Sequence, residues 1–183
     1  MRLIIFILSL TSITQTFAQK YQGENLSTVF LSEAPLNTFE GVSENLIGLI
    51  DLDKNLVDFY VDLNTLDTGI GLRDRHMRDD YLETQEYPYA EFTGRFSDDD
   101  LENIKKGNSG SYTVEGKFSV HGVERIRETE LQLDFIQNMS KVNFETELDI
   151  ELTDHKIKIP KLLFYELSND IKITSSGMLT IKK

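Results

Sequence analysis

The chain has 183 residues, and its 31 Asp and Glu residues against 19 Lys and Arg residues give a formal net charge of −12. Binding to a nucleic-acid backbone needs clustered cations, so this charge argues against nucleic acid as a partner. It also argues against stable insertion into, or residence on, an anionic membrane. The chain contains no Cys, which excludes a disulfide framework, a thiolate metal site and a Cys nucleophile.

Residues 1–18 have the features of a secretory signal peptide. Arg2 supplies a positive charge, Leu3 to Leu10 is apolar except for Ser9, and Thr16-Phe17-Ala18 ends in a small residue. The apolar run is about half as long as the 18 or so residues that span a bilayer. We therefore predict cleavage after Ala18, export to the periplasm or the medium, and one folded domain over residues 19–183.

Most of this domain alternates between apolar and polar residues, which is typical of strands with one buried face. The alternation is clearest over residues 142–152. Residues 112–120 and 131–135 alternate on either side of His121-Gly122, which predicts a hairpin. Further strands are predicted at residues 20–23, 28–32, 37–41, 46–52, 57–63, 90–96, 171–173 and 178–182, with a bend at residues 175–177 between the last two.

Two segments without alternation, residues 72–82 and 98–106, are predicted to form short helices. Eight or more antiparallel strands with a helical insertion predict an all-β barrel or sandwich. Glycines recur inside the strands, and interior glycines mark sharp coiling or space kept open for a ligand. These glycines favour the barrel over the sandwich. They are Gly41, Gly48, Gly94 and Gly116.

The sequence contains no recognisable catalytic constellation. A G-x-S-x-G elbow and a Gly-rich phosphate loop are both missing. His76, His121 and His155 lack the spacing that places two imidazoles on one metal ion. His121 fits a hairpin turn and His155 fits a loop. We expect a protein that is not an enzyme and that has no metal and no cofactor, other than a bound isoprenoid or similar lipid.

Several motifs occur in one order along the chain. They are Glu40-Gly41 to Asp51, Asp67-Thr68-Gly69, Arg73-Asp74-Arg75-His76-Met77-Arg78, Tyr87-Pro88-Tyr89-Ala90-Glu91-Phe92 and Gly116-Lys117-Phe118-Ser119-Val120-His121-Gly122-Val123. The order and spacing resemble those of the YceI-like family, small exported lipocalin-like barrels associated with binding polyisoprenoids or other amphiphiles. The resemblance covers nearly all of residues 28–152.

Two segments depart from the pattern of that family. Residues 153–157 read Thr-Asp-His-Lys-Ile, where YceI-like proteins often carry an R-x-D-F-G stretch. Residues 21–30 also lack the usual D-x-x-H-S opening. The chain therefore resembles a divergent member of the family that keeps the barrel and changes what the barrel holds.

The resemblance implies a barrel of about eight strands whose apolar cavity holds a polyisoprenoid, quinone-like or fatty-acyl molecule. The candidate cavity residues are Val57, Phe59, Val61, Phe92, Phe96, Tyr112, Val114, Phe118, Leu133, Phe135, Phe144 and Leu148. Cations at the cavity mouth could bind a polar headgroup, and the candidates are Arg73, Arg75, His76 and Arg78. The interpretation that we favour for these cations is a salt-bridged cap with Asp74, Asp79 and Asp80 over one end of the barrel.

Two other functions are compatible with the sequence. In the first, the same inward residues form a solid core, and the acidic outer face of a structural module docks a partner protein. In the second, His76 and a neighbouring acid form an enzyme active site. An exposed strand edge would also allow a homodimer, although no feature of the sequence requires one.

Overall fold

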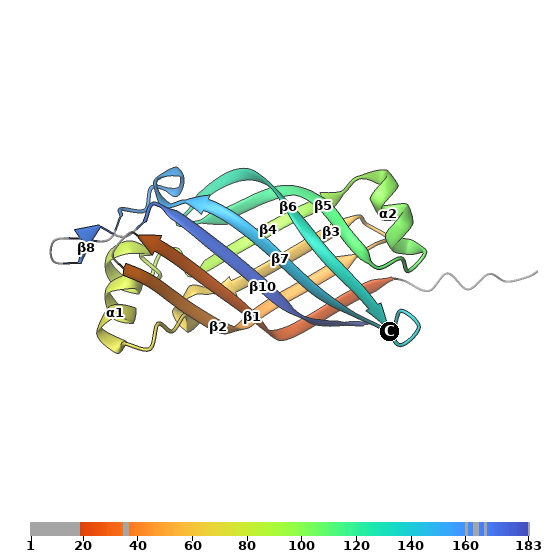
Figure 1. The fold of residues 1–183 in the computed structure, drawn as a ribbon, viewed down its shortest axis with the longest axis horizontal. Helices are drawn as coiled ribbons and strands as arrows, with labels where there is room; N and C mark the ends of the chain where they lie inside the picture. The colour runs from red at the N-terminus through yellow and green to blue at the C-terminus, as the bar shows by residue number, and fades with distance from the viewer. Residues whose placement is uncertain (1–18, 35–36, 160, 163–164, 167, 183) are drawn as a thin grey trace, which may run out of the picture.

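The computed structural model describes residues 19–34, 37–159, 161–162, 165–166 and 168–182, so the predicted signal peptide lies outside the described residues. Eight antiparallel strands of this part close into a barrel in the order β1-β10-β7-β6-β5-β4-β3-β2 (Figure 1). The strands are β1 (Lys20–Ala34), β2 (Asn37–Asp51), β3 (Leu56–Asp62), β4 (Tyr89–Phe96), β5 (Gly110–Val120), β6 (Val123–Ile136), β7 (Lys141–Glu151) and β10 (Asp170–Ile181). The predicted barrel is confirmed.

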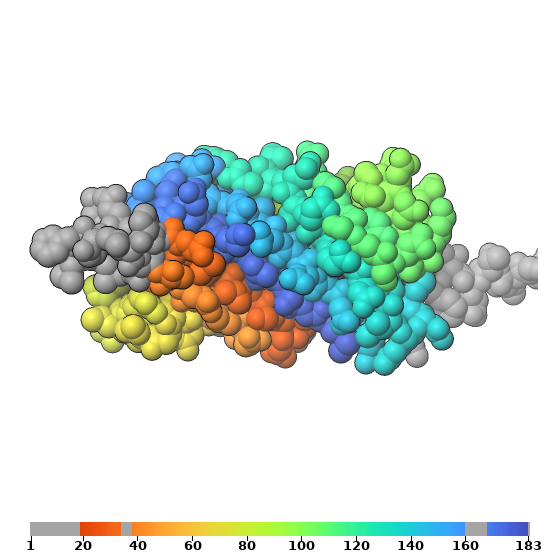
Figure 2. Space-filling model, viewed as in Figure 1, coloured from red at the N-terminus to blue at the C-terminus, as the bar shows by residue number. Residues whose placement is uncertain are grey.

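The remaining elements lie between the barrel strands. They are η1 (Leu63–Thr65), α1 (Gly71–His76), η2 (Met77–Tyr81), α2 (Asp98–Lys105), η3 (Leu152–His155), and a small hairpin of β8 (Lys161–Leu162) and β9 (Tyr165–Glu166). The predicted helix over residues 72–82 is α1 continued by the π-helical turn η2. Helices α1 and α2 lie at opposite ends of the elongated molecule (Figures 1 and 2).

Three pairs of predicted short strands are in fact single long strands. Residues 20–23 and 28–32 both belong to β1, residues 37–41 and 46–51 to β2, and residues 171–173 and 178–181 to β10. The register between β1 and β2 shifts twice between Gly23 and Thr28. Such bulges interrupt the alternation without ending the strand. The predicted bend at residues 175–177 is wrong, because these residues pair continuously with residues 144–146 of β7.

The interior glycines make room for aromatic rings and neighbouring backbone rather than for a ligand. A Cβ atom at Gly41 would overlap the Phe30 ring, and one at Gly48 would overlap the Phe59 ring. Gly94 and Gly116 face each other across β4 and β5. The expectation that these glycines keep space open for a ligand is therefore not met at these positions.

The barrel end next to α2 is filled by side chains. Ile104 of α2 and Leu133 of β6 are fully buried there. The Tyr21 ring lies 5.8 Å from the Phe135 ring, centroid to centroid, and the Tyr21 hydroxyl donates to the Met139 carbonyl oxygen over 2.8 Å. This packing closes one end of the barrel.

Candidate functional site

The other end of the barrel, beside α1, is hollow. Its cavity has a volume of about 650 Å³ and is lined mainly by apolar side chains. The structure places seven of the twelve predicted cavity residues along this wall, and these are Val57, Phe59, Val61, Phe92, Val114, Phe118 and Leu148. They come from β3, β4, β5 and β7, so the wall is assembled from strands far apart in sequence.

The other five predicted cavity residues do not line the cavity. Phe96, Tyr112, Leu133 and Phe144 are buried in the packed core, and Phe135 contacts Tyr21 in the filled end. All five lie on strands that also contribute residues to the cavity wall, namely β4, β5, β6 and β7. Alternation along a strand identifies the inward side, but it does not give the depth along the barrel axis, and these residues lie too deep.

The predicted set of twelve leaves out Val120, Leu131 and Ile150 of the strongly alternating strands, and it leaves out the wall contributed by the rest of the chain. The β10 residues Ile171 and Ile173 line the cavity, as do apolar residues in and around η1, α1, η2 and η3. The alternation of Ile171-Lys172-Ile173 was a usable signal. The residues in and around the short helices gave no such signal in the sequence, since their inward position depends on how these segments fold over the barrel end. They are Leu63, Leu66, Ile70, Leu72, Met77, Tyr81, Leu82, Leu152 and Ile157.

The predicted headgroup cations divide into two pairs. Arg73 and His76 line the cavity, whereas Arg75 and Arg78 do not. The Arg73 side chain donates from Nε to the Thr68 hydroxyl over 2.8 Å and from Nη2 to the Thr68 carbonyl oxygen. Its guanidinium also lies 4.6 Å from the centroid of the Phe39 ring, a distance suited to a cation–π contact. Arg73 is thus largely engaged within the protein.

Asp74 holds α1 to the segment that precedes it. Its buried carboxylate accepts hydrogen bonds from the backbone N–H and the hydroxyl of Thr68. Burial acts to raise the pKa of Asp74, but the Thr68 hydrogen bonds and the charges of Arg78 and Arg73 outweigh it and hold the pKa below its usual value. The predicted salt-bridged cap is not formed: Asp74 is bound by Thr68, Asp80 pairs with His76, and no ion pair joins these acids to the three arginines among the described residues.

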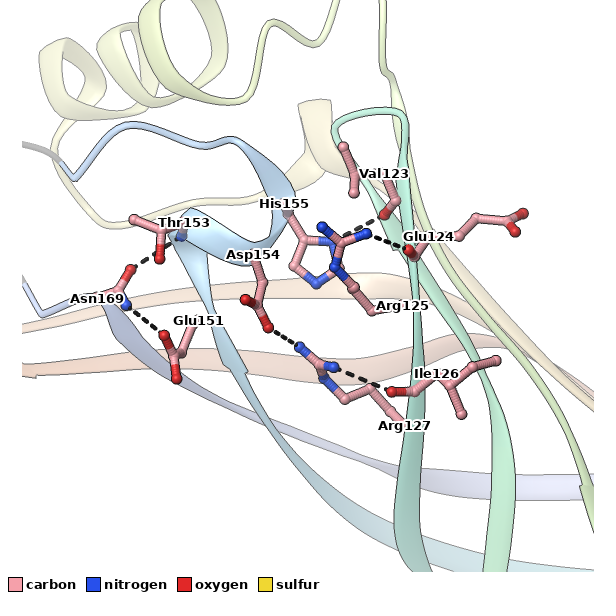
Figure 3. A network of polar contacts seen from close by, with 10 residues as sticks. All are labelled: Val123, Glu124, Arg125, Ile126, Arg127, Glu151, Thr153, Asp154, His155 and Asn169. Carbon is pink, nitrogen blue, oxygen red and sulfur yellow. Dashed lines mark hydrogen bonds and ion pairs between the residues drawn. The ribbon is translucent and has the colours of Figure 1, made fainter.

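The divergent stretch at residues 153–157 packs against the β5–β6 hairpin (Figure 3). Contrary to the simple loop expected, His155 ends η3 and is completely buried. Its Nδ1 lies 2.9 Å from the Val123 carbonyl oxygen, and burial lowers the pKa of its imidazole. Asp154 accepts from Arg127 over 2.6 Å. The departure from the family pattern therefore builds a packed junction.

His121 is at the β5–β6 turn, as predicted, and its two ring nitrogens lie 3.1 Å from the His155 carbonyl oxygen and 2.9 Å from a Glu83 carboxylate oxygen. His76 instead lies 2.9 Å from Asp80 on the helical insertion. Within the described ranges, no three His, Asp or Glu side chains are grouped so that they could hold a metal ion. A helix long and apolar enough to cross a membrane is also missing from those ranges.

Comparison with known proteins agrees with this geometry. The family model described as the YceI-like domain matches residues 20–179. A polyisoprenoid-binding domain from Saccharophagus degradans, implicated in plant cell wall breakdown, has 16% sequence identity and a TM-score of 0.71, over 91% of this chain and 100% of that one. Burkholderia cenocepacia BcnA has 13% identity and a TM-score of 0.64, over 85% and 96% of the two chains.

A third similar structure is a Campylobacter jejuni YceI protein, with 16% identity and a TM-score of 0.63, over 82% of this chain and 90% of that one. No curated protein matches the chain. At these identities the structures show a shared fold, whereas the family model covers nearly the whole described barrel. The chain belongs to the YceI-like family.

Proposed function

We propose that this protein is an exported carrier that holds one long apolar or amphiphilic molecule, of the polyisoprenoid, quinone-like or fatty-acyl class, in the barrel cavity. The observation that carries the proposal is the cavity of about 650 Å³, within the range of about 300–1,000 Å³ typical of small-molecule sites. Family membership and the polyisoprenoid-binding relative support the ligand class. The cavity favours this carrier function over the alternative of a solid barrel that only binds a partner protein.

Apolar contact alone is sufficient for useful affinity. At about 25 cal/mol per Å², burying a few hundred Å² of hydrocarbon contributes several kcal/mol before the costs of ordering the ligand. If each heavy atom takes about the 30 Å³ that a water molecule occupies in the liquid, the cavity holds roughly 20 heavy atoms. A longer tail would have to extend through the mouth.

The lining residues have distinct proposed roles. The apolar side chains of β3, β4, β5, β7 and β10 hold the tail, with Phe59 and Phe92 as large contributors. At the mouth, His76 and the Arg73 nitrogen that is not bound to Thr68 are the nearest candidates for a polar headgroup. Arg75 and Arg78 remain candidates only for a headgroup that extends beyond the cavity.

Native and denaturing mass spectra of the same purified sample test the proposal. Extra mass that disappears on denaturation would establish a carried molecule, and extraction would identify its class. If the native mass equals that of the polypeptide alone, N-phenyl-1-naphthylamine, an uncharged fluorescent apolar probe, tests the cavity directly. Failure of the probe to bind would overturn the carrier function.

A matched pair of variants locates the binding. Leu148 lines the cavity, and its neighbour Asp149 is exposed on the outside of the same strand. Leu148→Trp should reduce probe binding at least several-fold because the indole occupies the cavity, whereas Asp149→Trp should bind like the wild type. Circular dichroism of both variants checks that they fold, since overpacking can itself destabilise a core. Equal probe binding by both variants would contradict a site in the cavity.

A further inference from the structure

The deep end of the cavity carries a row of hydroxyl groups. Four adjacent barrel strands each contribute one residue to it, and we call this row the hydroxyl floor: Thr28 of β1, Ser175 of β10, Thr146 of β7 and Thr129 of β6. Ser175 pairs directly with Thr28 on one side and with Thr146 on the other. The Thr28 and Ser175 hydroxyl oxygens are 2.9 Å apart, and those of Thr129 and Thr146 are 2.8 Å apart.

The floor lies where the cavity ends. On β1, β10 and β7 its members are the lining residues farthest from α1. The next inward residues in that direction include Leu26 and Phe144, which belong to the buried core. On β6 the apolar residue Leu131, which pairs with Thr146, lies one inward position farther from α1 than Thr129. A molecule that enters past α1 therefore reaches the hydroxyl floor, beside Leu131, with the part that penetrates deepest.

The hydrogen bonds within the floor leave one donor unused. Thr129 donates to the Glu147 carbonyl oxygen over 2.7 Å, so Thr146 is the donor of the Thr129–Thr146 pair. Thr28 and Ser175 have one bond between them, and only one of their two hydrogens can occupy it. One O–H of this pair is thus left without an acceptor among the described contacts, and both residues line the cavity.

A second lining hydroxyl also lacks a partner. Ser32 lies four residues, about 13 Å along β1, from Thr28 in the direction of the mouth, and it is completely buried. Its hydroxyl has no hydrogen-bond partner in the described part of the chain. A buried hydroxyl without a partner costs about 1–3 kcal/mol, and buried polar groups are rarely left so.

A partly buried hydroxyl pair outside the cavity has no unused donor. Thr65 donates to the Asp62 carbonyl oxygen over 2.6 Å, so Ser43 donates to Thr65 over 2.6 Å, and both hydrogens are used. Neither residue lines the cavity. The residues with unused donors, Thr28 or Ser175 and Ser32, by comparison all belong to the cavity wall.

We propose that the hydroxyl floor is a polar subsite that recognises an uncharged oxygen function, a carbonyl or hydroxyl group, at the deep end of the carried molecule. This inference rests on the proposed carrier function and narrows its ligand class. The ionisable lining side chains of Arg73, His76 and Glu91 all lie on α1 or near the start of β4. With only neutral hydroxyls at the floor, burying an ionised group there would be strongly unfavourable, whereas a neutral acceptor satisfies the free O–H.

The test compares 2-tridecanone with tridecane, which differ by one carbonyl group in place of a methylene group. Both are measured by displacement of N-phenyl-1-naphthylamine from wild-type protein and from the double variant Thr28→Val/Ser175→Ala. For each protein we take the ratio of ketone affinity to alkane affinity. Comparing this ratio between the two proteins cancels the difference in free energy of transfer from water between the ketone and the alkane. We expect the ratio to fall roughly 3- to 10-fold in the double variant, as for the loss of one hydrogen bond.

Thr93→Val is the matched control, because Thr93 is an exposed outward residue of β4 whose hydroxyl donates to Asp58 over 2.9 Å. It should leave the ratio unchanged. If both compounds bind and the double variant keeps the wild-type ratio, the hydroxyl floor is overturned while the carrier function stands. If neither compound nor the probe binds the wild type, the carrier function itself fails.

Infrared spectroscopy supplies a second test that does not depend on the folding of the double variant. The carbonyl stretch of bound, carbon-13-labelled 2-tridecanone should lie at a lower frequency than in hexadecane, because a hydrogen bond weakens the carbonyl bond. The lowered frequency should persist in His76→Ala, which removes a donor at the mouth and leaves the floor intact. An unshifted carbonyl stretch in the wild type would overturn the proposal.

Discussion

At the scale of single residues, His155 is a buried histidine whose ionisation is coupled to folding. Its Nδ1 is bonded to the Val123 carbonyl oxygen, and its Nε2 has no partner within the described residues. Burial is the largest effect and lowers its pKa from the ordinary 6.5. The Val123 hydrogen bond and the charge of Asp154 act to raise the pKa, and the charges of Arg127 and Arg125 act to lower it. The folded protein therefore takes up this proton at a lower pH than the unfolded chain.

We predict that the free energy of unfolding decreases as the pH falls from 7 to 5. The unfolded state binds more protons in this range, so stability rises with pH, by at most about 1.4 kcal/mol per pH unit for one proton. His155→Leu should be less stable than the wild type at pH 7, but its free energy of unfolding should decrease less steeply between pH 7 and 5. Urea denaturation at several pH values measures both proteins.

The comparison separates His155 from acidic groups. Asp74 and Glu130 have pKa values below their ordinary 3.8 and 4.5, so their contributions to stability are lost only at lower pH. Equal slopes for the wild type and His155→Leu between pH 7 and 5 would show that His155 does not titrate with folding.

At the scale of elements, α1 is held over the cavity by few polar contacts. Asp74 and Arg73 both bind Thr68, and Met77, which follows α1, is buried against the cavity. The helix has only six residues, too few to be stable alone. Its position therefore depends on this small network.

We predict that Asp74→Asn loosens α1 without unfolding the barrel. The substitution removes the charge that faces Arg73 and Arg78, and it should cost about 1–3 kcal/mol locally. Amide hydrogen exchange over residues 68–77 should become at least tenfold faster, while the amides of β5 and β6 stay protected. The exposed neighbour Asp79 provides the control Asp79→Asn, and similar exchange in the two variants would refute the role of Asp74.

The pair of β4 and β5 depends on Gly116. A Cβ atom there would lie 2.5 Å from the Thr93 carbonyl oxygen and 2.6 Å from the Gly94 Cα atom. Both are backbone atoms that cannot rotate away, so Gly116→Ala should destabilise the protein by about 1–3 kcal/mol. Thermal unfolding followed by circular dichroism measures the loss. Gly71→Ala is the control, since a Cβ at Gly71 has no atom within 4 Å, and an equal melting temperature for both variants would contradict the argument.

At the scale of the whole molecule, the net charge of −12 predicts weak attraction to anionic membranes. The protein should remain in the supernatant when it is sedimented with vesicles of phosphatidylglycerol and phosphatidylcholine, at both low and high salt. Vesicles of phosphatidylcholine alone are the reference for contacts that do not depend on charge. If the protein sediments with the anionic vesicles at low salt and is released at high salt, the prediction is wrong and the protein has a local cationic surface.

The sequence by itself determined the all-β class and the inward face of most strands, because alternation with period 2 is a local property of the chain. It also determined the β5–β6 hairpin and both helices, and its ordered motifs identified the family. Bulges concealed the continuity of β1 and β2, since a register shift breaks the alternation without ending the strand.

Only the tertiary structure decided how deep each inward residue lies. Phe59 and Phe144 both point inward and their rings are 4.8 Å apart, yet only Phe59 lines the cavity. The hydroxyl floor likewise joins residues far apart in the sequence, from Thr28 to Ser175, and the sequence pattern placed Ser175 in a bend and Thr129 outside the predicted strands. Local patterns carry no information on strand order or axial position, because both are set by barrel closure and by the packing that fills one end and leaves the other hollow.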